Sequence, residues 1–248
     1  MSGTPKTDRP EAPDAARAIV VVPTYNERET IRALAESVLS LAGRWRLLIV
    51  DDASPDGTGD LADALARQYD RVSVIHRAAK EGLGPAYLAG FAEVLKWSDV
   101  GFIAQMDADF SHDPQDLPRL LDATADAELA IGSRYVRGGA TVGWGLRRRL
   151  LSRWGNAYVR AVLRLPIRDL TAGFRCWRRG ALEAIDLGAV RTRGYGFQIE
   201  MAARAIAAGC RAVEVPICFR ERRAGKSKMS GSIVTEALVL PWKLRHLA

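Results

Sequence analysis

Short runs of Val, Ile and Leu alternate with helical patterns through the first half of the chain, and this alternation constrains the fold most. The apolar runs predict buried strands, and the apolar residues between them recur at the spacing of one helix face. The predicted strands are 18–23, 47–50, 72–76, 103–106 and 129–133. Helices are predicted after Asn26 and over 58–69, 84–96 and 114–125. The pattern therefore predicts an α/β fold with a mostly parallel sheet and helices on both faces.

Polar residues follow the predicted strands at the end where a parallel sheet binds its ligands. They are 24–27 (TYNE), 51–52 (DD), Asp107, Asp109 and Arg134. No G-x-G-x-x-G follows the first strand, and no G-x-x-x-x-G-K-[ST] occurs. A dinucleotide dehydrogenase and a P-loop NTPase would therefore lack their usual phosphate-binding loops.

The segment 106–112 (MDADFSH) places two carboxylates two residues apart after an apolar run. On an extended strand, residues i and i+2 point to the same side, so Asp107 and Asp109 can converge on one cation. Mg²⁺ is commonly held by one or two protein carboxylates together with substrate phosphate oxygens. A D-x-D pattern alone also occurs in solvated turns and caps. The interpretation of Asp107 and Asp109 as a metal site therefore depends on the other polar residues that follow predicted strands.

Composition limits the domain count and the kind of partner. A chain of 248 residues, 48% of them hydrophobic, favours one domain, for which we expect the bounds 18–232. A net charge of +7 fits nucleic acid, an anionic membrane surface or phosphorylated ligands. Residues 1–17 are expected to be a disordered tail without a signal peptide, and 233–248 an amphipathic helix. No apolar run approaches the ~20 residues of a membrane span, so we expect a cytoplasmic, at most peripheral, protein.

The segment 129–168 contains nine arginines and no acidic residue. One face of a helix within it would carry Leu150, Leu151, Trp154, Tyr158, Ala161 and Leu165. Another face would carry Arg149, Arg153, Arg160 and Arg164. A basic amphipathic helix of this kind can lie in a membrane interface. An ordinary helix packed on the core, with a solvated basic face, fits the same pattern, and both interpretations stay open here.

Short segments in a fixed order carry a resemblance to a known family. The first ones are 21–27 (VVPTYNE), 50–57 (VDDASPDG), 107–109 (DAD) and 132–135 (GSRY). Together they resemble family 2 glycosyltransferases of the GT-A fold. Further segments are 138–139 (GG), 169–175 (DLTAGFR), 194–200 (GYGFQIE) and 222–228 (RRAGKSK). With these, the chain is similar to the polyprenol (dolichol) monophosphate mannose synthases over about 18–232, within a single Rossmann-like domain.

The resemblance implies inverting transfer of mannose from GDP-mannose to a polyprenyl monophosphate, with Mg²⁺ or Mn²⁺ as cofactor. It implies that Asp107, Asp109 and Ser111 bind the metal, and that Asp109 and Arg148 are catalytic, with Arg148 near the acceptor. The implied nucleotide-sugar-binding residues are Pro23, Tyr25, Glu27, Val50, Asp52, Met106, Asp107, Ala108, Arg134, Gln198, Arg222 and Lys228.

This chain departs from some relatives in two ways. Some carry a glutamine ligand where this chain has Ser111, so a hydroxyl or a water would complete the metal site here. Some continue into transmembrane helices. We therefore expect attachment through an anionic membrane surface, or through a membrane-anchoring protein or domain.

Structural roles compete with the functional ones at several positions. Asp51 and Asp52 could cap the turn after their strand, and Tyr25 and Glu27 could simply end a strand and begin a helix. The segment 222–228 could be an exposed basic loop. Glu200 could position the acceptor or the sugar, or it could be a buried carboxylate whose hydrogen bonds are all satisfied.

Chemistry narrows the reaction class. A phosphate monoester is already anionic at neutral pH, so the implied acceptor needs no general base, whereas a hydroxyl acceptor normally does. Transfer of glucose or another sugar from UDP to a polyprenyl phosphate stays open. A different class, RNA or DNA binding, lacks an interleaved aromatic platform, so we expect no nucleic-acid partner. A membrane scaffold would not need both Asp107 and Asp109.

Overall fold

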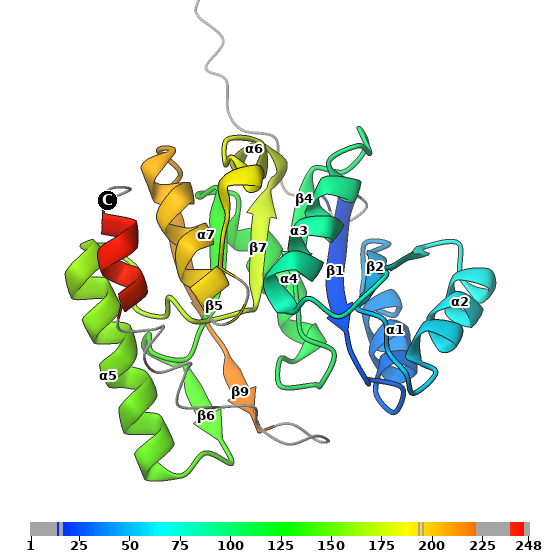
Figure 1. Cartoon of the computed structure of the whole chain (residues 1–248), viewed down its shortest axis with the longest axis horizontal. Helices are drawn as coiled ribbons and strands as arrows, with labels where there is room; N and C mark the ends of the chain where they lie inside the picture. Colours follow the sequence, from blue (N-terminus) through cyan, green and yellow to red (C-terminus); the bar gives the residue numbers. More distant parts are fainter. Residues whose placement is uncertain (1–13, 15–16, 193, 195, 222–238, 246–248) are drawn as a thin grey trace, which may run out of the picture.

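Residues 14, 17–192, 194, 196–221 and 239–245 are described by a computed structural model. Among them, seven strands form one twisted sheet through the centre of the molecule (Figure 1). In sheet order they are β3 (Val72–His76), β2 (Arg46–Asp51), β1 (Ala18–Thr24), β4 (Phe102–Gln105), β7 (Arg175–Arg178), β5 (Leu129–Ser133) and β8 (Ala212–Pro216). All neighbouring pairs are parallel except those of β7, which runs antiparallel to both β4 and β5.

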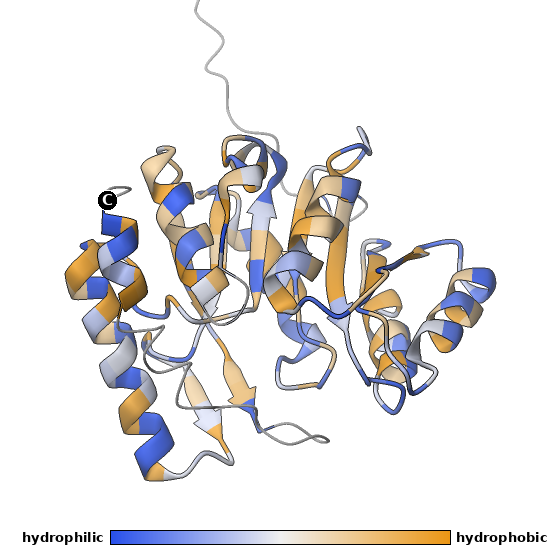
Figure 2. Cartoon of the chain, in the orientation of Figure 1, coloured by the Kyte–Doolittle hydropathy of each residue, from blue (hydrophilic) through white to orange (hydrophobic). Residues whose placement is uncertain are grey.

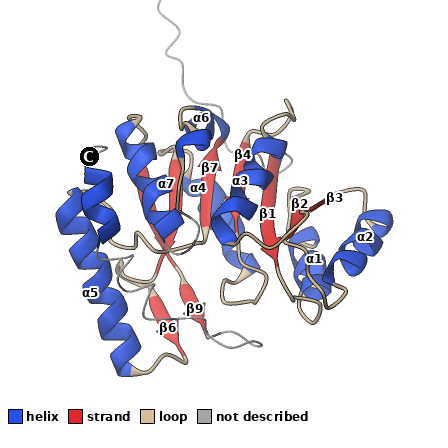
Figure 3. Ribbon diagram, in the orientation of Figure 1, coloured by secondary structure: helices blue, strands red, loops and turns tan. Residues whose placement is uncertain are grey.

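Helices cover both faces of this sheet, because its central strands are apolar on both sides (Figure 3). On one face lie α1 (Ile31–Leu39), α2 (Thr58–Gln68), η2 (Pro114–Asp116) and α4 (Leu117–Ala123). On the other lie α3 (Leu83–Val94), α6 (Arg179–Glu183), η3 (Leu187–Ala189), α7 (Gly196–Ala207) and the end of α5 (Leu146–Leu163). Successive residues of β1 alternate between the two cores: Val20 packs in the first and Val21 in the second.

The predicted α/β class and the mostly parallel sheet are confirmed. Each predicted strand is present to within one residue at either end, and 72–76 and 129–133 match exactly in their bounds. The antiparallel β7 was not predicted, because its sequence, Arg-Cys-Trp-Arg, has charged ends and no apolar run. Arg175 nevertheless lies fully buried inside the sheet, since its guanidinium donates to backbone carbonyls of the preceding loop.

A second, two-stranded sheet extends from the main one and leads to α5. It consists of β6 (Ala140–Val142) and β9 (Cys218–Arg220), which pair in parallel. The chain leaves β6 through Gly143, Trp144 and Gly145 and enters α5 directly. This places the first turn of α5 beside the end of β9 (Figure 1).

Helix α5 is the element for which the sequence left two interpretations open. Its buried residues are Asn156, Val159 and Leu163, a face that was not predicted. Leu150 and Trp154 are 58% and 57% exposed, whereas Tyr158 packs against the core, so the predicted face packs on the core only towards the end of the helix. The helix also ends at Leu163, and Arg164 adopts a left-handed conformation, so the predicted continuation to Leu165 does not occur. Figure 2 shows hydrophobic and hydrophilic residues mixed along the helix.

The predicted domain bounds stay a prediction. Most of the tail 1–17 and more than half of the predicted helix 233–248 lie outside the described residues. Within the described part of that segment, 239–244 are helical and lie beside α5, where the indole N–H of Trp242 donates to the hydroxyl of Tyr158 at 2.8 Å. In the part of the chain that the structure covers, no helix combines the length and the apolar composition of a membrane span.

Candidate active site at the carboxyl edge of the sheet

The predicted site residues gather where the parallel strands end. β1 lies next to β4, and from this pair the chain winds to β2 and β3 on one side and to β5 and β8 on the other. Such a reversal leaves a crevice outside the carboxyl ends of the two central strands, where open α/β sheets bind ligands. Asp107 and Asp109 follow β4 at this point, and Tyr25 follows β1.

A turn follows Asp107 and includes Asp109, so the two aspartates do not lie on one extended strand as expected. Strand β4 ends at Gln105, residues 108–109 form the turn, and Phe110, which follows it, has a φ of 57°. Asp109 is buried, and its Oδ1 accepts a hydrogen bond from the backbone N–H of Ser111 at 2.9 Å. A non-glycine residue in the left-handed region costs energy that folds tend to keep at functional sites. The turn therefore fixes Asp109 in place through its own backbone.

Tyr87, which sequence reasoning missed, lies under the aspartate pair. It comes from α3, is fully buried, and stacks on Phe197 with ring centroids 5.8 Å apart. Its hydroxyl donates to Asp107 Oδ1 at 3.4 Å. Burial raises the pKa of this phenol well above its ordinary value, and the charge of Asp107 raises it further. The Tyr87 hydroxyl therefore stays protonated at neutral pH and can donate its hydrogen bond to Asp107.

Two buried side chains beside the pair have polar atoms without a partner among the described residues: the hydroxyl of Ser111 and the amide of Gln198. Gly173 lies between that amide and the carboxylate of Asp107. A Cβ added to Gly173 would lie 3.5 Å from Nε2 of Gln198 and 3.8 Å from both carboxylate oxygens of Asp107. Because buried polar groups usually have partners, such atoms mark a place where a ligand, an ion or a water supplies them.

The end of β1 carries Tyr25 and Glu27. The ammonium of Lys80, from the loop before α3, lies 3.5 Å from the centroid of the Tyr25 ring, a close cation–π contact. The backbone N–H of Glu27 donates to the hydroxyl of Thr58 at 3.0 Å, and its carboxylate accepts from Thr30 at 3.3 Å. These contacts tie the loop after β1 to the start of α2.

The two aspartates after β2 have different surroundings. Asp51 accepts from the hydroxyl of Thr24 and from both N–H and O–H of Ser54, so it caps its turn as the structural alternative predicted. Asp52 pairs with Arg77 and accepts from the backbone N–H groups of Glu81 and Gly82. Asp52 thus anchors the loop that brings Lys80 over Tyr25, and its contact with a nucleotide stays a prediction.

Other predicted nucleotide-binding residues differ in how accessible they are. Val50 and Met106 are fully buried, one in each of the two cores, so their contact with a nucleotide stays a prediction. Ala108 is also buried, whereas Pro23 is half-buried. Arg222 and Lys228 lie outside the described residues.

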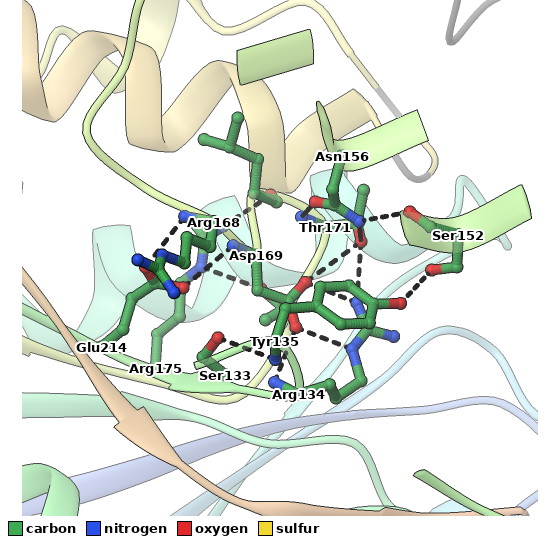
Figure 4. Close-up of polar contacts among 12 residues, drawn as sticks. Ser133, Arg134, Tyr135, Ser152, Asn156, Arg168, Asp169, Thr171, Arg175 and Glu214 are labelled. Carbon is green, nitrogen blue, oxygen red and sulfur yellow. Dashed lines mark hydrogen bonds and ion pairs between the residues drawn. The ribbon is translucent and has the colours of Figure 1, made fainter. Parts of the chain in front are cut away.

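Arg134, at the end of β5, is held by Asp169 (Figure 4). Asp169 is fully buried and accepts from the backbone N–H of Arg134 at 2.9 Å, from Nε at 2.8 Å and from an Nη at 2.6 Å. The same guanidinium also donates to the hydroxyl of Thr171 at 2.8 Å. Its central carbon lies between 5.2 and 5.4 Å from the rings of Tyr135, Trp144 and Phe219. Arg134 is therefore a fixed, largely buried cation.

A buried asparagine connects this pair to α5. The side chain of Asn156 donates to the hydroxyl of Thr171 at 3.0 Å and to the carbonyl of Ser152, and it accepts from the backbone N–H of Thr171 (Figure 4). Tyr135 adds a hydrogen bond to the hydroxyl of Ser152 at 2.6 Å. Hydrogen bonds along these side chains, rather than apolar packing alone, set the position of α5 against the site.

Arg175 braces the loop that carries Asp169. It donates to the carbonyls of Leu170 and Ala172 at 3.0 and 2.9 Å. Burial lowers the pKa of this guanidinium to about 9, and the negative charge of Asp169 limits the shift. Arg175 is therefore charged at neutral pH inside the sheet, and it holds the loop between Arg134 and the aspartate turn.

Glu200 has the structural role that the sequence left open. The carboxylate accepts from the backbone N–H groups of Arg191 and Thr192, from the Thr192 hydroxyl and from Arg204. Burial acts to raise its pKa, but these hydrogen bonds outweigh burial and lower it. Glu200 thus fastens the segment before α7, and it is a satisfied buried carboxylate.

Arg148, the predicted acceptor-side residue, lies in the first turn of α5. Its guanidinium carbon is 4.1 Å from the centroid of the Trp144 ring, and it pairs with Glu221 at 3.0 Å. Trp144 therefore contacts both Arg134 and Arg148, although the strands and helices that carry them are separate. No sequence pattern marked Trp144, because it lies alone between two glycines.

A comparison with known families assigns the chain to one of them. The pattern of the family described as "Glycosyl transferase family 2" matches residues 19–186, more than half of the chain. The chain therefore belongs to glycosyltransferase family 2.

Two relatives are similar over nearly the whole chain. "Polyprenol monophosphomannose synthase" from Mycolicibacterium smegmatis is 51% identical over 245 residues, which are 97% of this chain and 91% of the relative. "Undecaprenyl-phosphate mannosyltransferase" from Micrococcus luteus is 48% identical over 226 residues, 90% of this chain and 91% of that protein.

Solved structures share the fold at low sequence identity. Glucosyl-3-phosphoglycerate synthase from Mycobacterium tuberculosis, in complex with Mn²⁺, UDP-glucose and phosphoglyceric acid, has a TM-score of 0.68 and 19% identity over 95% of this chain and 83% of its own. A mannosyltransferase from Pyrobaculum calidifontis, in complex with GDP-mannose and Mn²⁺, has a TM-score of 0.59 and 19% identity over 90% and 62%. The fold is thus the α/β GT-A type, and these structural relatives bind Mn²⁺.

Proposed function

We propose that this chain transfers mannose from GDP-mannose to a polyprenyl monophosphate, with inversion at the sugar, and releases GDP. The observation that carries the proposal is the Asp107–Asp109 turn at the reversal between β1 and β4. Both relatives described above are named for mannose transfer to, or synthesis of, such a lipid phosphate, and they match this chain over at least 90% of its length.

The residues around the turn fit a divalent cation, Mg²⁺ or Mn²⁺. Asp107 and Asp109 would supply carboxylate oxygens, and Ser111 offers a buried hydroxyl without a partner among the described residues. No group of three or more His, Cys, Asp or Glu side chains in the described ranges is arranged to hold a metal ion by itself, and substrate phosphate oxygens would complete the coordination. A cation bound there would neutralise the charge of the departing diphosphate.

The protein's own residues then have three tasks toward the donor. Tyr87 keeps Asp107 oriented through its hydroxyl, and the backbone of the turn does the same for Asp109. Tyr25, under Lys80, offers an aromatic face at the end of β1. Gln198, with both polar atoms of its amide open to a ligand's hydrogen bonds, is positioned across Gly173 from Asp107 and would bind the sugar or a phosphate.

The acceptor side needs positive charge rather than a base. A phosphate monoester attacks as an anion, so the protein must only attract and orient it. Arg134 and Arg148, both on the Trp144 indole, are the cations placed for this task. Of the described histidines, His76 pairs with Asp63, whereas the ring of His112 stacks on Phe174 and its Nδ1 accepts from the backbone N–H of Asp107 at 3.5 Å.

The exposed side of α5 would bring the enzyme to its lipid substrate. Apolar side chains that are about half exposed or more line this side and the neighbouring segments: Val142, Leu146, Leu150, Leu151, Trp154, Val239 and Trp242. Exposed arginines lie between them, at 149, 153, 160 and 164. Apolar contacts together with arginines suit an anionic membrane surface. Vesicle binding that survives the change of these four arginines to glutamine would contradict this placement.

A panel of donors tests the proposed reaction. GDP-mannose, UDP-glucose and UDP-GlcNAc would each be offered, with Mg²⁺ or Mn²⁺, to one short-chain prenyl phosphate, and the glycolipid product measured. We expect mannose transfer at least about tenfold faster than transfer of either other sugar. Faster transfer from a UDP-sugar, or no transfer from any donor, would overturn the proposal.

A further inference from the structure

The ion pair between Arg148 and Glu221 differs from the other arginine pair in the site. Glu221 follows β9 directly, and its carboxylate lies 3.0 Å from an Nη of Arg148. The Glu221 side chain is 53% exposed. Asp169, the partner of Arg134, is fully buried and accepts three hydrogen bonds from that arginine. One pair is thus built into the fold, whereas the other is open to solvent.

The main chain holds Glu221 in place even though its carboxylate is exposed. Its backbone N–H donates to the carbonyl of Val142 at 3.0 Å, which continues the pairing of β6 with β9. Its side chain crosses Gly143, which has a φ of +85°, and a Cβ added there would lie 2.8 Å from the Cβ of Glu221. The glycine therefore leaves the space in which Glu221 turns toward Arg148.

The Trp144 indole brings the two arginines to one place. The guanidinium carbons of Arg134 and Arg148 both lie within 5.4 Å of its ring centroid. The indole is buried, and its N–H has no partner among the described residues. The two guanidinium carbons are therefore at most 9.5 Å apart, so a second fixed cation lies within that distance of Arg148.

We propose that Glu221 is a placeholder anion, which pairs with Arg148 until the phosphate monoester of the acceptor displaces it. This inference rests on the proposed function, because it takes the acceptor to be a phosphate monoester. An exposed ion pair is weak, so its loss costs the protein little. A phosphate with more charge and more acceptor oxygens than a carboxylate forms stronger charge-assisted hydrogen bonds with guanidinium groups. The exchange replaces one anion by another and breaks no covalent bond.

The test compares Glu221→Gln with a matched control, Glu183→Gln. Glu183 also pairs with an arginine, Arg179 at 2.6 Å, and is 50% exposed, but it lies on α6, away from the carboxyl edge of the sheet. The dissociation constant of a short-chain prenyl phosphate would be measured by calorimetry in the presence of GDP and Mn²⁺. Inorganic phosphate would be titrated in a separate arm, and thermal melting would check that each variant folds.

Removal of the placeholder should tighten binding of the phosphate group. We expect Glu221→Gln to lower the dissociation constant of both probes by up to about fivefold, because a competing pair of this kind is weak. The KM for the prenyl phosphate should fall by a similar factor while kcat and the affinity for GDP stay the same. Glu183→Gln should change none of these values. In an Arg148→Gln background, the effect of Glu221→Gln should disappear.

Three results would overturn the inference: unchanged or weaker prenyl phosphate binding in Glu221→Gln, a gain confined to inorganic phosphate, or an equal gain in GDP affinity. Failure of the proposed function looks different, since the unsubstituted protein would then transfer sugar faster from a UDP donor or transfer none from any donor. Active protein in which Glu221→Gln binds the acceptor no more tightly would contradict the placeholder alone.

Discussion

On the β1–β4 side of the site, backbone N–H groups of loops hold the carboxylates, together with side chains such as Tyr87. Asp109 accepts from the N–H of Ser111, and Asp52 from those of Glu81 and Gly82. On the β5–α5 side, contacts between buried side chains predominate, since Arg134 is held by Asp169 and Asn156 reaches Thr171. The carboxylates at the strand ends are thus held largely by loop backbone, whereas the arginine is held by a network of side chains.

The largest effect should come from the strand-end side. Asp109→Ala should lower mannose transfer at least ~10²–10³-fold, because it removes a charge placed for the leaving diphosphate. The melting temperature should stay the same or rise slightly, since a like charge next to Asp107 is lost. Asp122→Ala, an exposed aspartate on α4, is the control. Activity close to normal at saturating Mn²⁺ would show that the turn does not bind the metal.

Substitutions on the β5–α5 side should instead lower the stability of the folded protein. Asp169→Ala leaves the buried guanidinium of Arg134 without its partner, which typically costs ~3–5 kcal/mol. For a chain of this size the melting temperature should fall by roughly 6–20 °C. Asp99→Ala breaks an exposed pair with Arg46 and should cost no more than ~1 kcal/mol. Similar melting temperatures for the two variants would remove the distinction between the two sides.

The pH dependence of stability tests how much the Glu200 carboxylate contributes by holding the segment before α7. The pKa of Glu200 in the folded protein lies below its ordinary value of 4.5, so the charged carboxylate stabilises the fold at neutral pH. This contribution is lost as the pH falls through the folded-state pKa. The urea midpoint of the unsubstituted protein should therefore fall more between pH 7 and pH 3 than that of Glu200→Gln. An equal fall of the urea midpoint in the two proteins would mean that ionisation of Glu200 does not contribute to the stability of the fold.

The smallest stability effect is expected at the exposed side of α5. Changing Leu150 and Trp154 to serine removes apolar side chains that are largely exposed in the folded protein. The free energy of unfolding should therefore change by ~0.5 kcal/mol or less per site. Val159→Ser, on the buried side of the same helix, is the contrast and should cost several times more. Binding to anionic vesicles should weaken only for the first pair. A large loss of stability in the first pair would place their face in a folded interface.

The sequence predicted the two sides unequally well, for a physical reason. Apolar runs followed by polar residues are local patterns, so the strands and the residues at their carboxyl ends, such as Asp107 and Tyr25, could be predicted. The antiparallel β7, the role of Tyr87 and the indole of Trp144 depend on contacts between distant segments, which no local pattern encodes. The orientation of α5 was open for the same reason: its apolar residues satisfy a helical period, but Asn156 decides which side faces the protein.

We propose that the site has two halves, one that binds the nucleotide and metal and one that binds the acceptor phosphate. Calorimetry on two variants tests it directly, with Mn²⁺–GDP and a short-chain prenyl phosphate titrated in turn. Asp109→Ala should lose Mn²⁺-dependent GDP binding and keep most of its affinity for the prenyl phosphate. Arg148→Gln should keep GDP binding and bind the prenyl phosphate at least ~10-fold more weakly. Equal loss of both ligands in both variants would contradict the account.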